Sequence, residues 1–215
     1  MVIEDLEVEK VIACWPTKDA AAVQPITRFV TGITKEALEK PSMTILPEEE
    51  WPDDIPSSYV RASTETWEKL VEEGWKRGLF QPCPEKEVIR DRRGRKILNG
   101  AGAVPKEKNG KILQRFISIF CPINAISQKI SGDEATLPYV GQVSLLHIPE
   151  EAEILIDSED MQSAFNLFEM PIGWRGLFCY EKRVRGRCLG LNTDEPCFVS
   201  LKTVPMGWIS AVGGL

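Results

Sequence analysis

The sequence of 215 residues predicts an α+β fold from three local patterns. An amphipathic helix is expected over 63–78, and a β-hairpin is expected around Asn109-Gly110. A short strand followed at once by a helical segment is expected over 153–168. A chain of this length can bury a sizeable core and predicts one domain or slightly more.

The first 59 residues form an acidic N-terminal segment without a motif of recognisable chemistry. The segment ends in LPEEEWPDDIPSS, residues 46–58, where three prolines and five acids predict a linker or an extended connector. We call residues 46–58 the connector. The helix that follows is then expected to open the folded part of the chain.

The expected helix begins after Ser63, a residue type that caps helix N-termini. Gly78 is suited to end it, because glycine tolerates the left-handed backbone of a helix C-terminus. Four apolar residues between them have the spacing of one helix face: Trp67, Leu70, Val71 and Trp75.

Charge is unevenly distributed along the chain, whose net charge is −6. Residues 1–75 carry 7 Lys and Arg against 16 Asp and Glu, whereas residues 76–116 carry 12 against 4. The basic block can face phosphates although the whole chain is acidic, because short-range contacts decide where a polyanion binds. A solvated charged surface is the alternative interpretation.

The basic block contains the expected hairpin. Asn109-Gly110 between two strand-like runs favours a type I′ turn, which needs positive φ at both residues. The resulting register places four cations on one face of the ribbon: Lys106, Lys108, Lys111 and Arg115. Like charges that share a face repel unless an anion lies there, so the register predicts a ribbon that grips phosphate. A face that is basic only for solubility is the alternative.

Acidic residues lie at the junction between the expected strand, 153–156, and the helical segment after it. Asp157 and Glu159 alternate to one face of an extended chain, and Asp160 points to the other. Acids that precede a helix stabilise its N-terminal dipole, and this is the common reason for them. A carboxylate between a strand and a helix can also hold a metal ion, so both interpretations stay open from the residues alone.

Several functional classes lack support in the sequence. The six cysteines form no CxxC pair and the chain has one histidine, so a zinc site lacks ligands at workable spacing. There is no G-x-S-x-G, P-loop or Rossmann glycine pattern. No signal peptide and no apolar run of roughly 20 residues is found, which predicts an intracellular protein, cytoplasmic or nuclear, without a membrane partner.

Two aromatic and basic stretches near the C-terminus have plainer interpretations. Trp174, Phe178 and Tyr180 are expected in a strand, with core packing as the role of their rings. The basic run KRVRGR, residues 182–187, is expected to be a solvated turn.

Three short segments form a recognisable pattern through their order and spacing along the chain. DMQSAF, residues 160–165, has Ala and an aromatic at +4 and +5 from an aspartate, and Arg115 and Asn124 are nine residues apart. VPMGW follows at residues 204–208. Together they resemble the first carboxylate motif, the fingers motif and the L-P-x-G-W segment of reverse transcriptases. The resemblance covers roughly residues 60–215 and is closest to retrotransposons of the long-terminal-repeat type and their protist relatives.

The resemblance implies the fingers and partial palm of a polymerase right hand, with an antiparallel palm sheet left incomplete. Fingers with the basic hairpin would occupy residues 60–150, and the first palm motif would occupy 151–170. A second fingers piece and the start of the Pro-x-Gly palm motif would occupy 171–215.

The implied chemistry is template-directed deoxynucleotidyl transfer assisted by two Mg²⁺ ions. An RNA template, a DNA primer and deoxynucleoside triphosphates would be the partners. Asp160 would be the catalytic residue and a metal ligand, and Met161 would lend its backbone carbonyl. Phe165 would lie under the sugar and select against a 2′-hydroxyl.

The remaining implied contacts are to the nucleotide. Lys106 or Lys108, together with Arg115, would hold the triphosphate through charge-assisted hydrogen bonds. Met206 and Gly207 would lie against the nucleotide and the template base, since glycine lets the backbone approach closely.

The sequence departs from the family in its metal motifs. No Asp-Asp pair follows residue 160, although the family has a second metal motif after the Pro-x-Gly segment. One aspartate cannot hold two ions, so the chain is expected to be a truncated fragment that is inactive alone. The rest of the palm, the thumb and possibly ribonuclease H and integrase parts would be missing. The alternative is a decayed product that retains at most weak RNA or DNA binding.

Overall fold

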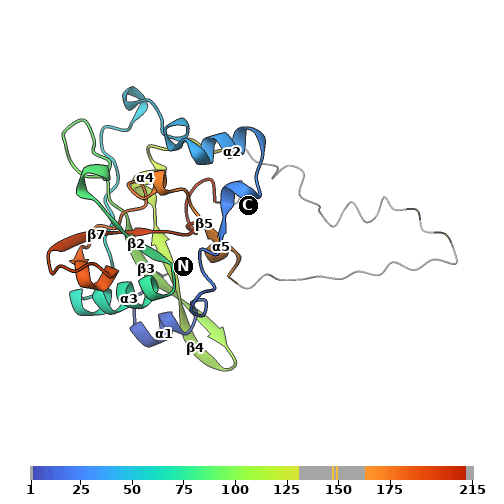
Figure 1. Cartoon of the computed structure of the whole chain (residues 1–215), viewed down its shortest axis with the longest axis vertical. Coiled ribbons are helices and arrows are strands. Elements are labelled where there is room, and N and C mark those ends of the chain that lie inside the picture. The colour runs from blue at the N-terminus through green and yellow to red at the C-terminus, as the bar shows by residue number, and fades with distance from the viewer. Residues whose placement is uncertain (1, 131–146, 148, 150–162, 212–215) are drawn as a thin grey trace.

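The computed structural model describes residues 2–130, 147, 149 and 163–211. These residues form a mixed helix and strand structure, which confirms the α+β class (Figure 1). Within them, no helix has the length and apolar character that crossing a membrane requires. The helices are α1 Val8–Ile12, α2 Gly32–Glu39, α3 Thr64–Lys76, α4 Cys121–Asn124 and α5 Ala164–Leu167. The strands are β1 Gln24–Pro25, β2 Phe80–Cys83, β3 Gly100–Lys108, β4 Lys111–Ile119, β5 Phe168–Glu169, β6 Val184–Arg185 and β7 Pro196–Leu201.

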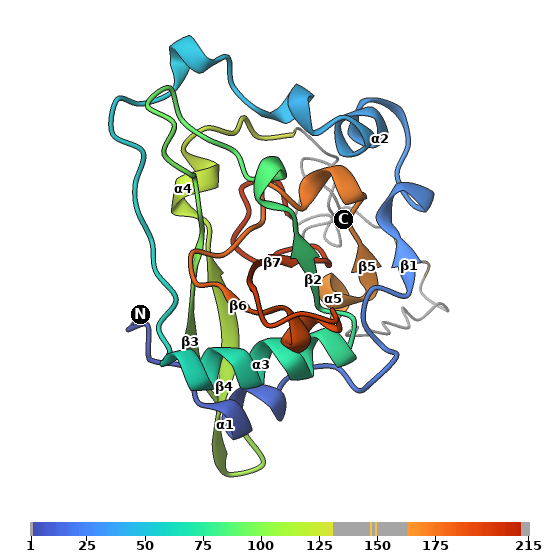
Figure 2. The same ribbon diagram turned by 60° about the vertical axis from the view of Figure 1, so that its left-hand side comes forward.

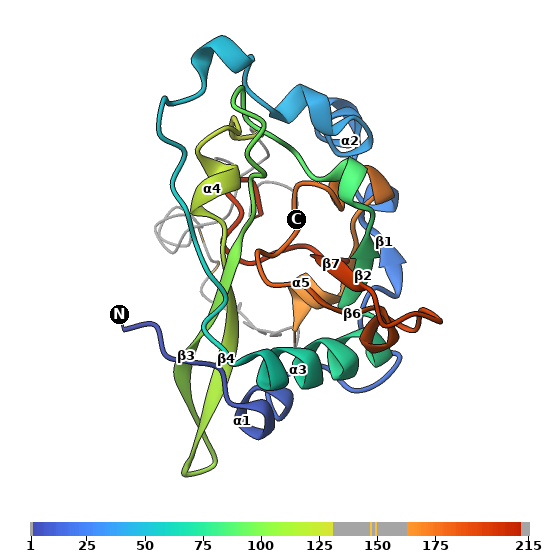
Figure 3. The same ribbon diagram turned by 90° about the vertical axis from the view of Figure 1, so that its left-hand side faces the viewer.

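The predicted hairpin is present as β3 and β4, which extend away from the body of the molecule (Figure 3). Asn109 and Gly110 have φ values of 53° and 70°, as a type I′ turn requires. The predicted register is confirmed at each of its three pairs: Lys108 with Lys111, Lys106 with Leu113, and Val104 with Arg115.

The predicted helix is α3, and both of its ends are built as expected. The Ser63 hydroxyl accepts a hydrogen bond from the Thr66 N–H at 3.1 Å. At the other end Gly78 has a φ of 81°, and its N–H donates to the Trp75 carbonyl. The next N–H, that of Leu79, donates back to the Gly74 carbonyl, which completes a Schellman motif.

The N-terminal cap of α3 is open to a direct test. Ser63→Ala removes the acceptor of the Thr66 N–H and is expected to lower the free energy of unfolding by about 1 kcal/mol. Urea unfolding followed by helical circular dichroism measures this loss. Ser63→Asp keeps a side-chain acceptor and is expected to restore most of the stability. Equal losses in the two variants would contradict a capping role.

A three-stranded antiparallel sheet, in the order β2-β7-β6, lies beside α3 (Figure 2). Its register pairs Phe80 with Leu201 and Cys83 with Phe198. A separate parallel pair joins β1 to β5, with Gln24 opposite Phe168. Phe168 therefore lies in a strand, and the expectation that it continues the helix is wrong.

The folded part of the chain begins before α3, which corrects the expectation that this helix opens it. Leu6, Val11, Ile26 and Leu38 are buried in the same cluster as Trp67. The connector has little regular structure beyond a short 3-10 turn at Glu48–Glu50, in keeping with its predicted extended form. The division of the chain at residues 59, 150 and 170 stays a prediction.

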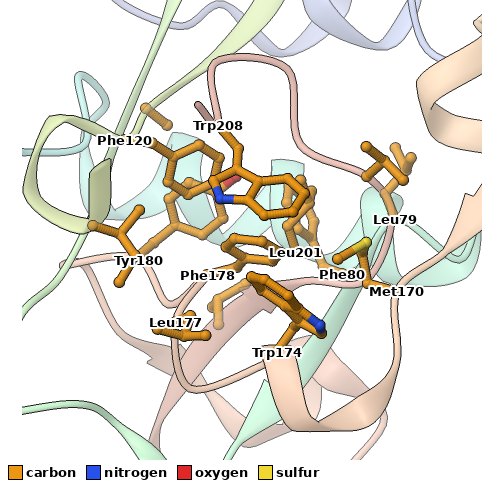
Figure 4. Packing of buried hydrophobic residues seen from close by; sticks show 14 of the residues in the cluster. Leu79, Phe80, Phe120, Met170, Trp174, Leu177, Phe178, Tyr180, Leu201 and Trp208 are labelled. Atoms are coloured by element: carbon orange, nitrogen blue, oxygen red, sulfur yellow. The ribbon is translucent and has the colours of Figure 1, made fainter. Parts of the chain in front are cut away.

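The core is rich in aromatic rings (Figure 4). Trp174 stacks on Phe178 with ring centroids 5.3 Å apart, and Trp208 lies edge-on to Trp174 at 4.7 Å. The predicted core role of Trp174, Phe178 and Tyr180 is thus confirmed, because all three are buried. The predicted strand is wrong, because Ile172–Trp174 is a 3-10 turn, residues 175–178 form a further turn, and only isolated bridges follow at Cys179 and Tyr180.

The basic side chains of residues 182–187 form ion pairs and hydrogen bonds with other residues of the chain. Arg185 forms an ion pair with Glu68, and Arg187 pairs with Asp194. Lys182 Nζ donates to the Ala62 carbonyl. Arg183, Arg185 and Arg187 are exposed, but the predicted turn is wrong, because Val184 and Arg185 form a short strand, Val184 is buried, and Gly186–Leu189 is a 3-10 helix.

Candidate functional site

A cavity of about 600 Å³ lies between the hairpin, the segment after α1, and α5. The ends of β2 and β7 complete its walls through Phe80 and Leu201. Five residues that the sequence singled out line it: Lys106, Lys108, Arg115, Phe165 and Met206. They come from three stretches that are far apart in the sequence, so only the fold brings them together. We call this space the hairpin cavity.

One wall of the hairpin cavity is cationic. Lys106 is half-buried, Lys108 and Arg115 are exposed, and none of the three has an ion-pair partner among the described residues. The described lining contains no Asp or Glu. Three unpaired cations that face a cavity without acids favour a multiply charged anion as ligand. Lys111, the fourth cation of the predicted face, is not part of the lining.

An aromatic cluster forms the apolar part of the cavity lining. Trp15, Phe80 and Phe116 line the cavity, and their ring centroids are 5.8 to 5.9 Å apart in edge-on contacts. Phe165 reaches the same space from α5 and packs against the core. A cavity lined by both cations and aromatic rings suits a ligand that has both an anionic and a planar apolar part.

The sequence did not indicate Trp15 as a residue of this cavity. It lies in a turn after the short helix α1, within a segment that carries no motif. Its contacts to Phe80 and Phe116 depend on how the N-terminal segment packs, which is a long-range property. No local pattern in the sequence signals it.

The segment around Gly207 is held in place by Asn124 at the end of α4. The Asn124 Nδ2 donates to the Gly207 carbonyl at 2.8 Å, and the Ile209 N–H donates to Asn124 Oδ1 at 3.0 Å. Both ends of one amide are thus used to fix the backbone that carries Met206. Gly207 itself has a φ of 100°, and a Cβ there would lie 2.9 Å from the Ser118 carbonyl oxygen.

A buried hydroxyl pair lies behind the cavity. The hydroxyl oxygens of Ser118 and Tyr180 are 2.7 Å apart, and Ser118 also lines the cavity. Burial raises the pKa of Tyr180, so the phenol stays protonated and neutral at physiological pH. The pair satisfies two polar groups in the core and adds no charge to the site.

Asp160 and Met161 lie outside the described residues, so their predicted roles stay predictions. Among the described residues, no group of three or more His, Cys, Asp or Glu is arranged to hold a metal ion. The described lining of the hairpin cavity offers cations and no carboxylate, and therefore none of the charged ligands that usually hold Mg²⁺. Whether Mg²⁺ fits this site rests on Asp160.

No protein-family model matches the chain, and no curated protein matches its sequence.

Proposed function

We propose that the hairpin cavity is the deoxynucleoside triphosphate site of an RNA-directed DNA polymerase of a retrotransposon. The observation that carries the proposal is that Lys106, Lys108, Arg115, Phe165 and Met206 line one cavity. Lys106, Lys108 and Arg115 belong to the basic hairpin, Phe165 to the segment that resembles the first carboxylate motif, and Met206 to the Pro-x-Gly segment. A chance resemblance gives no reason for these side chains to meet.

In this proposal, different residues of the cavity bind different parts of the nucleotide. Lys106, Lys108 and Arg115 bind the triphosphate, and each charge-assisted hydrogen bond contributes on the order of 1.5 to 3 kcal/mol. The aromatic wall accepts the planar base, and Phe165 stands where a sugar would lie. Gly207, which is not in the lining, is held by Asn124 and lets the segment that carries Met206 lie close to β4.

The rest of the polymerase follows from the same proposal. The chain supplies the fingers and the first part of the palm of a right-hand fold, and an RNA template and a DNA primer are its partners. Two Mg²⁺ ions supply charge neutralisation at the reacting phosphate when bound, and Asp160 is the ligand that this chain contributes. The remaining palm and the thumb are further partners.

Nucleotide binding tests the proposal without requiring polymerisation. Titration of dTTP with Mg²⁺ into the chain, followed by calorimetry, is expected to show one site. Arg115→Ala and Lys108→Ala are each expected to raise the Kd about ten- to a hundred-fold, because each removes a charge-assisted contact.

Lys111→Ala is the matched control for these variants. It removes a lysine from the same face of the same hairpin, but Lys111 is not part of the cavity lining. Its Kd is expected to stay close to that of the parent chain. Equal weakening by Lys111→Ala and Lys108→Ala would mean a diffuse charge effect and overturn the site. Salt-dependent RNA or DNA binding without any dTTP binding would favour the decayed product instead.

A further inference from the structure

Residues 90–96, RDRRGRK, form a small stable turn at the end of β3 remote from the hairpin tip. Arg90 bridges to Lys96, and the Asp91 N–H donates to the Arg95 carbonyl at 2.9 Å. Gly94 has a φ of 74° with open space around it, so the chain reverses there without crowding. We call residues 90–96 the arginine turn.

Asp91 is the internal brace of the arginine turn. One of its carboxylate oxygens accepts from the backbone N–H groups of Arg93 and Arg95, at 2.9 and 2.8 Å. Its other oxygen accepts from Arg95 Nε at 2.7 Å. Burial opposes ionisation of Asp91, but these bonds outweigh it and hold the pKa of Asp91 below its usual range. The turn is therefore shaped by its single acid, which faces inward.

The arginine side chains of the turn differ in what they contact. Arg90 and Lys96 both pair with Glu85, and Arg95 pairs with Asp91. Arg92 and Arg93 are exposed and have no ion-pair partner within the described ranges. Two guanidinium groups are thus presented to solvent by a braced backbone, which reduces the entropy lost when they bind an anion.

Two apolar side chains of the connector, Trp51 and Ile55, lie beside these guanidinium groups. Figure 2 shows the connector running next to the arginine turn, away from the hairpin tip. A small cavity of about 140 Å³ is lined from one side by Arg92, Arg93 and Arg95, and from the other by Trp51 and Ile55. The Trp51 ring is fixed, because its Nε1 donates to the Leu46 carbonyl at 2.7 Å.

We propose that the arginine turn and Trp51 bind single-stranded nucleic acid, with Arg92 and Arg93 on phosphates and the Trp51 ring stacked on a base. Exposed cations beside an aromatic ring form the combination that binds unpaired strands. Trp51 is half-buried and packs against the core, so the part of its ring that faces the cavity is the part that a base would contact. A duplex keeps the faces of its bases stacked inside the helix and leaves only phosphates for such a surface. Asp53 also lines this cavity, and its exposed carboxylate opposes the binding of a phosphate next to it.

The position of the arginine turn suggests which strand it holds, and this step rests on the proposed function. Ser118, which lines the hairpin cavity, pairs with Ala101, only five residues after Lys96, so the turn lies within about 17 Å of the cavity. At most about five stacked nucleotides span this distance at 3.4 Å each. The strand is then the unpaired template on its way to the nucleotide site.

Fluorescence anisotropy with a labelled oligothymidylate of about twenty nucleotides, long enough to span this distance, tests the site. Arg92→Ala/Arg93→Ala is expected to raise the Kd at least ten-fold. It is also expected to reduce the slope of log Kd against log salt by about 1.4, since each lost phosphate contact on a single strand contributes about 0.7.

Arg28→Ala/Lys35→Ala removes the same charge from exposed positions elsewhere and serves as the control. Its Kd and salt slope are expected to match those of the parent chain. Equal losses in the two double variants would overturn the proposal, because binding would then follow net charge alone. A duplex of the same length that binds as tightly as the single strand would also overturn it.

The role of the ring is separated from packing by two substitutions of Trp51. Trp51→Phe keeps a ring and is expected to bind nearly as tightly as the parent chain. Trp51→Leu keeps apolar volume without a ring and is expected to bind about ten-fold more weakly. Equal affinities in these two variants would show that the Trp51 ring does not stack on a base.

Failure of this inference can be told from failure of the nucleotide site. Arg92→Ala/Arg93→Ala is expected to leave dTTP binding unchanged, because neither arginine lines the hairpin cavity. Loss of dTTP binding in Arg115→Ala with retained oligonucleotide binding would support both sites independently. Absence of dTTP binding in the parent chain, with oligonucleotide binding that depends on Arg92 and Arg93, would leave the arginine turn standing and remove the proposed template role.

Discussion

Trp67→Ala is expected to lower the free energy of unfolding by about 3 to 5 kcal/mol, the largest loss of any single substitution considered. The Trp67 side chain is fully buried, and its ring centroid lies 5.3 Å from that of Tyr180 and 5.9 Å from that of Phe80. Its Nε1 donates to the Lys182 carbonyl at 2.9 Å. The variant therefore leaves a cavity and also strands a buried carbonyl.

The effect on the hairpin cavity follows from the same contacts. Phe80 lines that cavity, so loss of its neighbour in the core loosens one wall. Natural domains have about 5 to 15 kcal/mol of stability, and a loss of this size is a large fraction of it. Urea unfolding followed by circular dichroism gives the change, provided that the dependence on urea concentration stays the same in the variant.

Trp75→Ala, in the same helix, is the matched control. The Trp75 side chain is 40% exposed and rests on the backbone at Gly190, so less of it is buried. We expect a loss of about 1 kcal/mol, well below that of Trp67→Ala. Equal losses at the two positions would mean that α3 does not present Trp67 to the core as described.

The parts of the fold that the sequence predicted depend on local chemistry. The β3–β4 register follows from Asn109 and Gly110, because few residues accept positive φ at both turn positions. The N-terminus of α3 follows from the side-chain acceptor of Ser63, and its C-terminus follows from the positive φ that Gly78 accepts. Once the register is known, the common face of Lys106, Lys108 and Arg115 follows without any knowledge of the rest of the chain.

The parts that the sequence did not predict depend on long-range packing or on a local conflict. Trp15 reaches the hairpin cavity only because the N-terminal segment packs against β4. The stretch before Phe178 has aromatic residues that favour a strand, but Pro171 and Gly173 disfavour one. A 3-10 turn forms there instead, with the Trp174 N–H donating to the Pro171 carbonyl. Phe168 leaves its helix to pair with Gln24, which no local spacing signals.

Some residues of the hairpin cavity were predicted from local geometry, and others were not. The cations were predicted from turn geometry, whereas Phe165 and Met206 were singled out through a resemblance to polymerases. Their meeting in one cavity depends on how β7 and the segment after it return to the hairpin. Asn124 fixes that return through two hydrogen bonds, a role that its spacing from Arg115 does not reveal.

Gly207→Ala is expected to weaken both the fold and the nucleotide site. At a φ of 100° an L side chain is strained, which costs on the order of 1 to 3 kcal/mol. The new Cβ would also lie 2.9 Å from the Ser118 carbonyl oxygen, so the segment or β4 must move. Movement of the segment breaks the bonds from Asn124 and shifts Met206 out of the hairpin cavity, and the Kd for dTTP is expected to rise about ten-fold.

Gly32→Ala separates backbone strain from the steric contact. Gly32 also has a positive φ, of 58°, but no atom lies within 4 Å of a Cβ there. It is expected to cost about 1 kcal/mol from the backbone alone and to leave dTTP binding unchanged. Urea unfolding on both variants compares a strained position that has this contact with one that lacks it, and dTTP calorimetry shows whether the contact with Ser118 also affects the site. If Gly207→Ala behaves like Gly32→Ala in both measurements, the segment that carries Met206 is not held against β4, and the hairpin cavity loses one of its walls.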